Sequence, residues 1–260
     1  MTDAVPEDTT ETSAPAQESA REPEPRGYAR VREIIRRGIG SFSRLGDLDD
    51  MYEPQGHDIL DYGWAGDGDR ALALLDRGAA SVSGFDLWWK DQDLERVSER
   101  MRALGLDGRT DFRLADPYAT SFPDDSFDVV IGVAILLHLD LERALGEIRR
   151  VLRPGGRGVF VEPLAHNPIL RAGRVVTSRT HADSGSHFTA SDWALCARVF
   201  PGFEHFEREL STIPLMPLNL VLPARAQRGL ARRAWSGDEW LMSRFPGLRK
   251  HARITFLVLQ

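Results

Sequence analysis

Two acidic residues and a glycine-rich loop are the features of this chain whose chemistry and spacing indicate a binding site. A short apolar run ends in Asp61, and a second apolar run, after a helix-like Ala/Leu segment, ends in Asp86. Between them lies a loop with three glycines, Gly63, Gly66 and Gly68. Glycine suits a reversal between strand and helix because it adopts positive φ and lets the backbone approach a ligand closely. The pattern predicts strand, glycine turn, helix and strand, as in nucleotide-binding α/β units.

The spacing and the charges of this stretch indicate which ligand it binds. Asp86 lies 23 residues after Gly63, about the distance at which an acid on the second strand meets a ribose diol. Asp61, Asp67 and Asp69 crowd the start of the predicted helix, where their carboxylates would repel a pyrophosphate. The glycines read G-x-x-G-x-G, which is not the dinucleotide spacing. A cationic nucleoside such as S-adenosylmethionine fits better, with Asp61 at its amine and Asp86 at its ribose. A turn with a purely structural role is the alternative.

Composition limits the class of protein. The chain has 260 residues, 42% of them hydrophobic, which is enough for one core domain with appendages. A net charge of −6 argues against a general nucleic-acid binder. No apolar run approaches the roughly 20 residues of a transmembrane helix, and the N-terminus lacks a secretory signal pattern. The single Cys196 excludes a disulfide framework. We expect a cytoplasmic protein.

The chain divides into four predicted parts. Residues 1–26 are rich in Pro, Glu, Thr and Ser, and we expect a disordered tail. Residues 27–56 form a helical cap, residues 57–213 with 251–260 form the core domain, and residues 214–250 are an insertion between the last two strands. Two hairpin strands need only a few connecting residues, so the insertion has another role. Its front is apolar and its back is basic, which we interpret as a helical lid over an apolar acceptor pocket. A dimer surface and an amphipathic membrane contact are the alternatives.

Further elements are predicted along the core. A helix after Asp86 has an inward stripe of Leu94, Val97, Met101 and Leu104. At its start Trp88 and Trp89 either stack on an adenine or fill the core. The remaining predictions are a short strand ending near Asp116, a strand over 127–131, a helix starting at 189–192, and strands over 203–213 and 253–259. A tight turn with Pro154, and with positive φ at Gly155 or Gly156, leads into a strand over 158–162. Asp116 would accept the exocyclic amine of adenine, or else cap a turn.

Several motifs in series resemble a known family. They are ILDYG, GFD, RLADPYATSFPDDSFDVVIGVAILLHL and ALGEIRRVLRPGGRGVFVEP. Together they resemble the class I S-adenosylmethionine-dependent methyltransferases over about residues 57 to 163. The resemblance implies a Rossmann-like sheet of seven strands in the order 3-2-1-4-5-7-6, with strand 7 antiparallel and helices on both faces.

The resemblance also implies the cofactor-binding residues. They are Asp61, Gly63, Trp64, Ala65, Gly66 and Gly68 for the methionine part, Asp86 with Leu87 for the ribose, Asp116 with Pro117 for the adenine, and Val133 on the sulfonium side. The family's loop usually reads Gly-Cys-Gly-x-Gly, whereas this loop has Trp64 and Ala65 and one extra residue. A Cβ at Ala65 takes up room, and the Trp64 side chain is large enough to reshape the pocket.

The predicted reaction is transfer of the sulfonium methyl to a small organic acceptor, with S-adenosylhomocysteine as product. His138 is the first candidate for the base that removes a proton from the acceptor, and His166 is the second. A structural role for His138 is the alternative. No metal is expected, because the histidines show no i, i+4 pair. A different reaction in the same pocket, or a non-catalytic partner subunit, would be the other functions. A homodimer is possible.

Overall fold

The computed structural model describes residues 48, 51–63, 65–164, 166–167, 188–212, 214–215, 218 and 221–260. The chain separates into two units, Met1–Arg37 and Gly38–Gln260, and all the described residues belong to the second. The predicted tail at 1–26, most of the predicted cap at 27–56, and Trp64 therefore lie outside the described residues. Among the helices that are described, none combines the length and the apolar character needed to cross a membrane.

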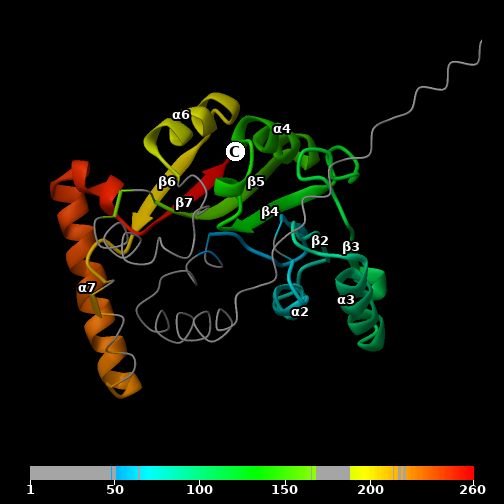
Figure 1. The fold of residues 1–260 in the computed structure, drawn as a ribbon, viewed down its shortest axis with the longest axis horizontal. Helices are drawn as coiled ribbons and strands as arrows, with labels where there is room; N and C mark the ends of the chain where they lie inside the picture. Colours follow the sequence, from blue (N-terminus) through cyan, green and yellow to red (C-terminus); the bar gives the residue numbers. More distant parts are fainter. Residues whose placement is uncertain are drawn as a thin grey trace, which may run out of the picture. The chain divides into compact units, whose positions relative to one another are not determined.

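A seven-stranded sheet forms the centre of the described unit (Figure 1). Its strands are β1 Asp58–Asp61, β2 Ser81–Gly84, β3 Thr110–Phe112, β4 Phe127–Val133, β5 Leu152–Pro163, β6 Glu204–Arg208 and β7 Ile254–Leu259. The order is β3-β2-β1-β4-β5-β7-β6, and β7 runs antiparallel to both of its neighbours. The sheet order predicted from the sequence is confirmed.

Helices cover the two faces of this sheet (Figure 1). The α-helices are α2 Asp69–Asp76, α3 Asp91–Ala103, α4 Leu141–Val151, α6 Ala190–Val199 and α7 Ala224–Arg244, and the 3-10 helices are η3 Asp107–Arg109, η4 Leu136–His138 and η6 Pro246–His251. Alternate strand residues face opposite sides, which produces two buried clusters. Leu60, Val130 and Phe160 pack with residues of α4 and α6, whereas Ile59 and Val129 pack with residues of α2.

Local sequence explains where several helices begin. Thr189 and Asp192 form a reciprocal capping box at the start of α6, as the predicted helix start requires. Asp140 caps α4, since its carboxylate accepts a hydrogen bond from the Arg143 N–H. Short-range capping signals therefore specify where both helices begin. Each helix then buries an apolar stripe against the sheet.

The structure corrects two of the predicted elements and confirms a third. Leu104 was expected in the buried stripe of α3, but α3 ends at Ala103 and Leu104 is 54% exposed. The strand predicted over 203–213 ends at Arg208, because Glu209 adopts a φ of 68° that no strand can continue. The predicted turn after Pro154 is confirmed, since Gly155 has a positive φ of 82°. The turn lies inside β5: Leu152 pairs with Phe127 and Arg157 with Val129, so four residues lie opposite Asp128.

Candidate active site

The candidate site lies where the strand order reverses direction. β1 is hydrogen-bonded to β2 on one side and to β4 on the other, and all three strands are parallel. Ligands of open parallel sheets bind outside the carboxyl ends of the strands at such a point. The loops after β1 and β4 are in close contact there, because a Cβ on Gly63 would lie 2.5 Å from Ile135 Cγ1. With a φ of +81° as well, this position requires glycine.

Hydrogen bonds join the glycine loop to the chain that follows β2. The Asp86 carboxylate accepts the Gly66 N–H at 3.2 Å through one oxygen and the Trp88 N–H at 2.9 Å through the other. The Ala65 N–H donates to the Phe85 carbonyl at 3.1 Å, and the Trp89 indole N–H donates to the Gly66 carbonyl at 2.9 Å. The loop is therefore held in one conformation by the segment that contains Asp86.

Arginines change the charge argument made from the sequence. Arg70 of α2 contacts Asp61, with Nη1 3.3 Å from Oδ1. Arg100 of α3 contacts Asp69 at 2.6 Å and Asp67 at 3.9 Å. The three carboxylates that were expected to repel a pyrophosphate are each partnered by a guanidinium. The repulsion between these carboxylates and the pyrophosphate of a dinucleotide is therefore weaker than the sequence alone indicated.

Asp61 itself is almost fully buried, with 1% of its surface exposed. Burial raises its pKa to about 6; the nearby Arg70 opposes this effect and Asp86 adds to it. The carboxylate and the Arg70 guanidinium together form a pair of opposite charges beside the loop. Such a pair matches the two charges of an amino-acid group.

Ala65, where the resembled family has glycine, has a specific neighbour. A Cβ on Gly84 would lie 2.9 Å from the Ala65 Cβ and 3.2 Å from the Asp61 carbonyl oxygen. Ala65 is buried, and its carbonyl accepts the Gly68 N–H at 3.1 Å. The space for the extra methyl group at Ala65 therefore comes from the glycine at the end of β2.

Asp116 and Pro117 lie in a turn and not at a strand end. β3 ends at Phe112, and the Asp116 carboxylate accepts the Tyr118 N–H at 2.8 Å. The sequence prediction of a strand ending near Asp116 is wrong, and the alternative of a turn cap describes this contact. Pro117 is nevertheless brought to the site, because the buried Tyr62 hydroxyl donates to its carbonyl.

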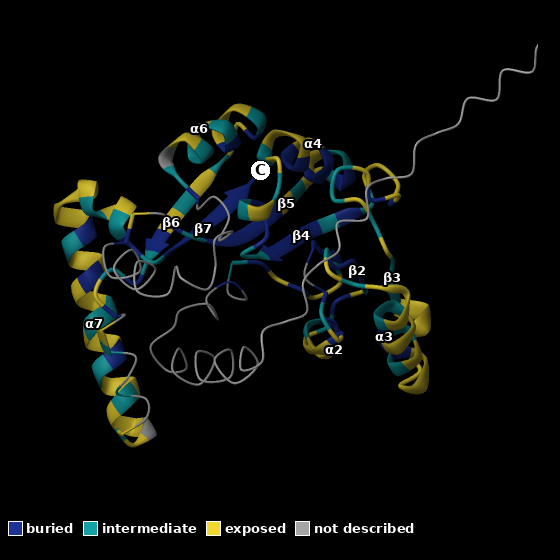
Figure 2. Cartoon of the chain, in the orientation of Figure 1, coloured by how far each residue is buried: buried dark blue, intermediate teal, exposed yellow. Residues whose placement is uncertain are grey.

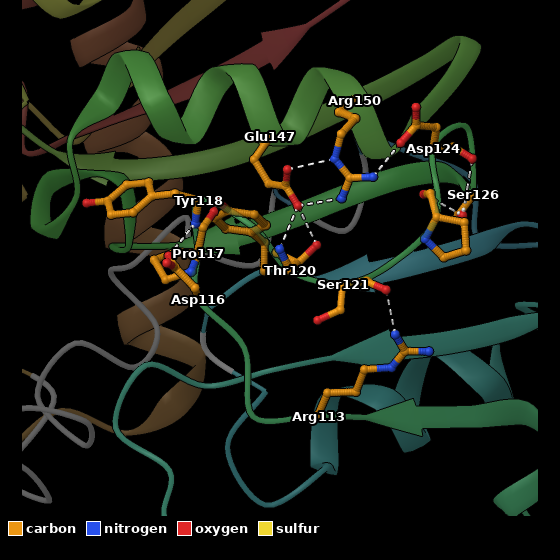
Figure 3. Close-up of polar contacts among 12 residues, drawn as sticks. Arg113, Asp116, Pro117, Tyr118, Thr120, Ser121, Asp124, Ser126, Glu147 and Arg150 are labelled. Atoms are coloured by element: carbon orange, nitrogen blue, oxygen red, sulfur yellow. Dashed lines mark hydrogen bonds and ion pairs between the residues drawn. The ribbon is translucent and has the colours of Figure 1, made fainter. Parts of the chain in front are cut away.

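A polar network fixes the segment between β3 and β4 against α4 (Figure 3). Glu147 accepts hydrogen bonds from the Thr120 N–H at 2.7 Å and the Thr120 hydroxyl at 2.6 Å. Arg150 donates to Glu147 at 2.8 and 2.6 Å and to Asp124 at 2.6 Å. Burial alone would raise the pKa of Glu147, but these hydrogen bonds outweigh it and lower the pKa. The carboxylate is thus a stable anchor for the segment that carries Asp116.

The two tryptophans after Asp86 have different surroundings. Trp89 packs edge-to-face on Phe112, at 5.8 Å between ring centroids. Trp88 is 43% exposed, and its ring meets the His138 ring edge-on at 5.6 Å. Of the pair, only Trp88 therefore retains a large exposed ring surface.

The backbone just before His138 is held by a buried acid that the sequence analysis did not single out. Glu162 of β5 is fully buried and accepts the backbone N–H groups of Ile135, Leu136 and Leu137 at 3.0, 2.9 and 3.4 Å. Burial raises its pKa to about 7, although these three bonds oppose the change. They fix the first turn of η4, and His138 lies at the end of η4 with its ring against Trp88 and the rest of its surface exposed. Partial burial lowers the pKa of His138 below its usual value.

The remaining predicted residues lie at varied distances from this centre. Leu87 is half-buried and donates its N–H to the Gly63 carbonyl at 3.4 Å, and Val133 ends β4 as a half-buried residue. His166 is exposed, and its carbonyl oxygen lies 2.9 Å from the His251 Nδ1 of η6. Within the described ranges, no group of three or more His, Cys, Asp or Glu side chains is arranged to hold a metal ion.

Comparison with known proteins agrees with this geometry. Residues 60–160 match the family model described as "Methyltransferase domain". The chain is 38% identical over 103 residues to methyltransferase GfsG of Streptomyces halstedii, covering 39% of this chain and 36% of that protein. It is 42% identical over 106 residues to demethylmenaquinone methyltransferase of Thermus thermophilus, covering 40% and 46%. The chain thus spans less than half the length of these relatives.

A solved structure extends the likeness of fold to most of the chain. Geranyl diphosphate methyltransferase in complex with S-adenosylmethionine superposes with a TM-score of 0.58 at 19% identity, covering 92% of this chain and 91% of that one. Residues 60–160 therefore resemble a class I S-adenosylmethionine-dependent methyltransferase domain, and the likeness in fold extends over most of the chain.

Sequence reasoning missed three residues that shape this site. Arg70 and Tyr62 reach partners 9 and 55 residues away, and Glu162 reaches partners 25 to 27 residues away. A weak signal existed for Glu162, which is an acid near the end of an apolar strand, as Asp61 is. Nothing local distinguishes Tyr62 from an ordinary core aromatic.

Proposed function

We propose that this protein transfers the sulfonium methyl group of S-adenosylmethionine to a small organic acceptor. The observation that carries the proposal is the grouping of the Asp61–Arg70 pair and Asp86 around one glycine loop at the strand-order reversal. The match of residues 60–160 to the methyltransferase domain supports it. When bound, S-adenosylmethionine would supply a methyl group on a positively charged sulfur. The acceptor would attack this methyl group in line with the carbon–sulfur bond.

The donor set of the site fits the two polar ends of this cofactor. Asp61 would pair with the α-ammonium group, and Arg70 would pair with the carboxylate. Each Asp86 oxygen already accepts one backbone N–H, and a carboxylate oxygen has a second lone pair for a ribose hydroxyl. Pro117 on one side and Val133 on the other would flank the adenine and the sulfonium.

The chain's own contribution to the reaction is positioning and proton removal. Holding the two reactants in line and excluding water supplies most of the rate enhancement in such a displacement. His138 would take the acceptor's proton, because its lowered pKa keeps the imidazole neutral near pH 7. His166 is the second candidate base. The apolar front of the insertion at 214–250, which precedes α7, would act as the lid over the acceptor.

The acceptor is proposed to be an uncharged or weakly charged organic molecule. The names of two relatives support a small organic acceptor: one is demethylmenaquinone methyltransferase, and the other, 34% identical over 103 residues, is 27-O-demethylrifamycin SV methyltransferase of Amycolatopsis mediterranei. A cytoplasmic location, a possible homodimer and the lack of a nucleic-acid partner belong to the same proposal.

Calorimetric titration with S-adenosylmethionine, S-adenosylhomocysteine and NAD tests the cofactor. We expect micromolar binding of the first two and none of NAD. Absence of binding to both sulfur compounds would overturn the proposal and favour a non-catalytic subunit.

Two histidine variants test whether His138 is the base that removes the acceptor's proton. His138→Asn should lower kcat about 100-fold in a labelled-methyl assay and leave the Kd of S-adenosylmethionine unchanged. His57→Asn, just before β1 at the opposite edge of the sheet, is the matched control and should change neither. Equal kcat in wild type and His138→Asn would remove His138 from the mechanism.

A further inference from the structure

Helix α7 and η6 form a strongly basic segment in an acidic chain. From residue 224 to residue 251 there are seven arginines and lysines and only two acids, although the whole chain has a net charge of −6. The basic residues are Arg225, Arg228, Arg232, Arg233, Arg244, Arg249 and Lys250. This positive charge is therefore concentrated on α7 and η6, at the β6 side of the sheet (Figure 1).

One side of α7 is buried against the rest of the protein. Ala231, Asp238 and Met242 are buried, and separations of seven and four residues place them on one side of a helix. The Asp238 carboxylate accepts the Leu210 N–H at 2.8 Å and the Ser211 N–H at 3.1 Å, in the chain after β6. These contacts fix which side of α7 faces outward.

The outward side carries the basic residues, and Figure 2 shows exposed positions along the whole helix. We call this side the α7 basic face: it consists of Arg225, Arg228, Arg232, Arg233, Trp240 and Arg244, all exposed. At 100° per residue they fall within an arc of roughly 160°, along a helix about 31 Å long. The exposed acid Glu239 lies in the same arc and contacts Arg208 at 3.9 Å, so the face keeps a net positive charge.

Large apolar side chains are exposed beside these arginines. Trp240 is 62% exposed, Phe245 51% and Val221 74%. The Arg244 guanidinium lies over the Phe245 ring, 5.3 Å from its centroid. Arginines interleaved with exposed tryptophan and phenylalanine are typical of surfaces that lie at the boundary between lipid headgroups and hydrocarbon.

We infer that the α7 basic face docks onto an anionic phospholipid surface. Phosphate groups on a flat surface can pair with guanidinium groups along the full length of a straight helix. The hydrocarbon just beneath them takes up the Trp240 and Phe245 rings. A nucleic acid offers phosphates without that apolar layer, so a membrane accounts for both kinds of exposed side chain. This inference does not depend on the proposed methyl transfer.

Vesicle co-sedimentation of the full chain tests the inference. Phosphatidylcholine vesicles with phosphatidylglycerol should bind the protein, pure phosphatidylcholine vesicles should not, and high salt should release it. Arg232→Gln/Arg233→Gln should weaken binding at least about tenfold, since each basic residue near an anionic surface contributes roughly fivefold. Trp240→Ser should weaken it at every salt concentration. Arg96→Gln/Arg102→Gln, at exposed positions of α3, is the matched control and should bind as wild type.

Five outcomes would overturn the inference, and the first four concern the vesicle and light-scattering measurements. They are equal binding to neutral and anionic vesicles, absence of binding to either, an equal loss in the α3 control, and light scattering that shows a dimer which Arg232→Gln/Arg233→Gln dissociates. Displacement of the protein from vesicles by stoichiometric duplex RNA would overturn it in favour of a nucleic-acid surface. Far-ultraviolet circular dichroism of each variant establishes that it is folded.

Discussion

Asp61 at the end of β1 and Glu162 near the end of β5 are buried acids at the same edge of the sheet, yet their partners differ. Asp61 faces the Arg70 guanidinium, whereas Glu162 accepts hydrogen bonds from three consecutive backbone N–H groups. A guanidinium on a side chain can re-pair when a charged ligand arrives, but backbone donors cannot leave without unfolding their turn. The β1–β2 half of the edge is thus suited to binding, and the β4–β5 half to holding a turn rigid.

The largest expected effect is on the binding half. Asp86→Ala removes the acceptor of two loop N–H groups and of the ribose hydroxyls, so S-adenosylmethionine affinity should fall at least about 100-fold by calorimetry. Asp76→Ala, an exposed acid of α2, should bind as wild type. If Asp86→Ala bound within about threefold of wild type, Asp86 would belong with Glu162 as a purely structural acid.

The second effect separates the two halves directly. Glu162→Ala leaves three N–H groups, two of them buried, without an acceptor, which should lower the free energy of unfolding by about 2 to 4 kcal/mol. It should also lower kcat while leaving cofactor affinity within about threefold, because the turn before His138 loosens. Glu162→Gln keeps one acceptor oxygen and should recover most of both losses. A large loss of cofactor affinity in Glu162→Ala would erase the distinction between the halves.

The pH dependence of binding tests the Asp61 side of the comparison. Burial raises the pKa of Asp61 to about 6, and only the ionised carboxylate attracts an ammonium group. Affinity for S-adenosylmethionine should therefore weaken as the pH falls below about 6, by up to tenfold per unit. In Asp61→Asn the affinity should be weak and nearly independent of pH over the same range.

The same raised pKa affects stability without ligand. The folded state binds the Asp61 proton more tightly than the unfolded state, so this residue's contribution to the free energy of unfolding declines as the pH rises from 3.8 to about 6. Urea titrations of wild type and Asp61→Asn across this range measure the difference. A wild-type curve that rises more steeply than the variant's would contradict the assignment.

The smallest effect concerns the altered loop. Gly84→Ala would place a Cβ 2.9 Å from the Ala65 Cβ, and overpacking of this kind costs about 1 to 3 kcal/mol. Ala65→Gly in the same chain should restore part of the stability, although the Asp61 carbonyl at 3.2 Å limits the recovery. Gly108→Ala, which has open space, is the control in denaturant unfolding. Additive losses in the double variant would show that the two positions are not coupled.

Local sequence patterns predicted where elements begin and end, but the contacts between residues far apart in the sequence could not be predicted. The strand ends at Asp61 and near Asp86, the start of α6 at Thr189 and the sheet order follow from apolar runs, capping residues and family motifs. The sequence placed Asp116 at a strand end, whereas its carboxylate accepts the N–H two residues later in a turn. An aspartate has the same sequence context in both positions, so the sequence does not distinguish them. Leu104 was misplaced because a helical stripe does not show where the helix stops.

The sequence by itself determined the order of the elements, the loop that needs glycine and the acids that end two neighbouring strands. Only the tertiary structure decided which acid receives which partner. Arg70 reaches Asp61, Tyr62 reaches the Pro117 carbonyl and Glu162 reaches the turn before His138. Periodicity and capping act within a few residues and are readable along the chain, whereas these pairings form across separate elements after the sheet has brought their ends together.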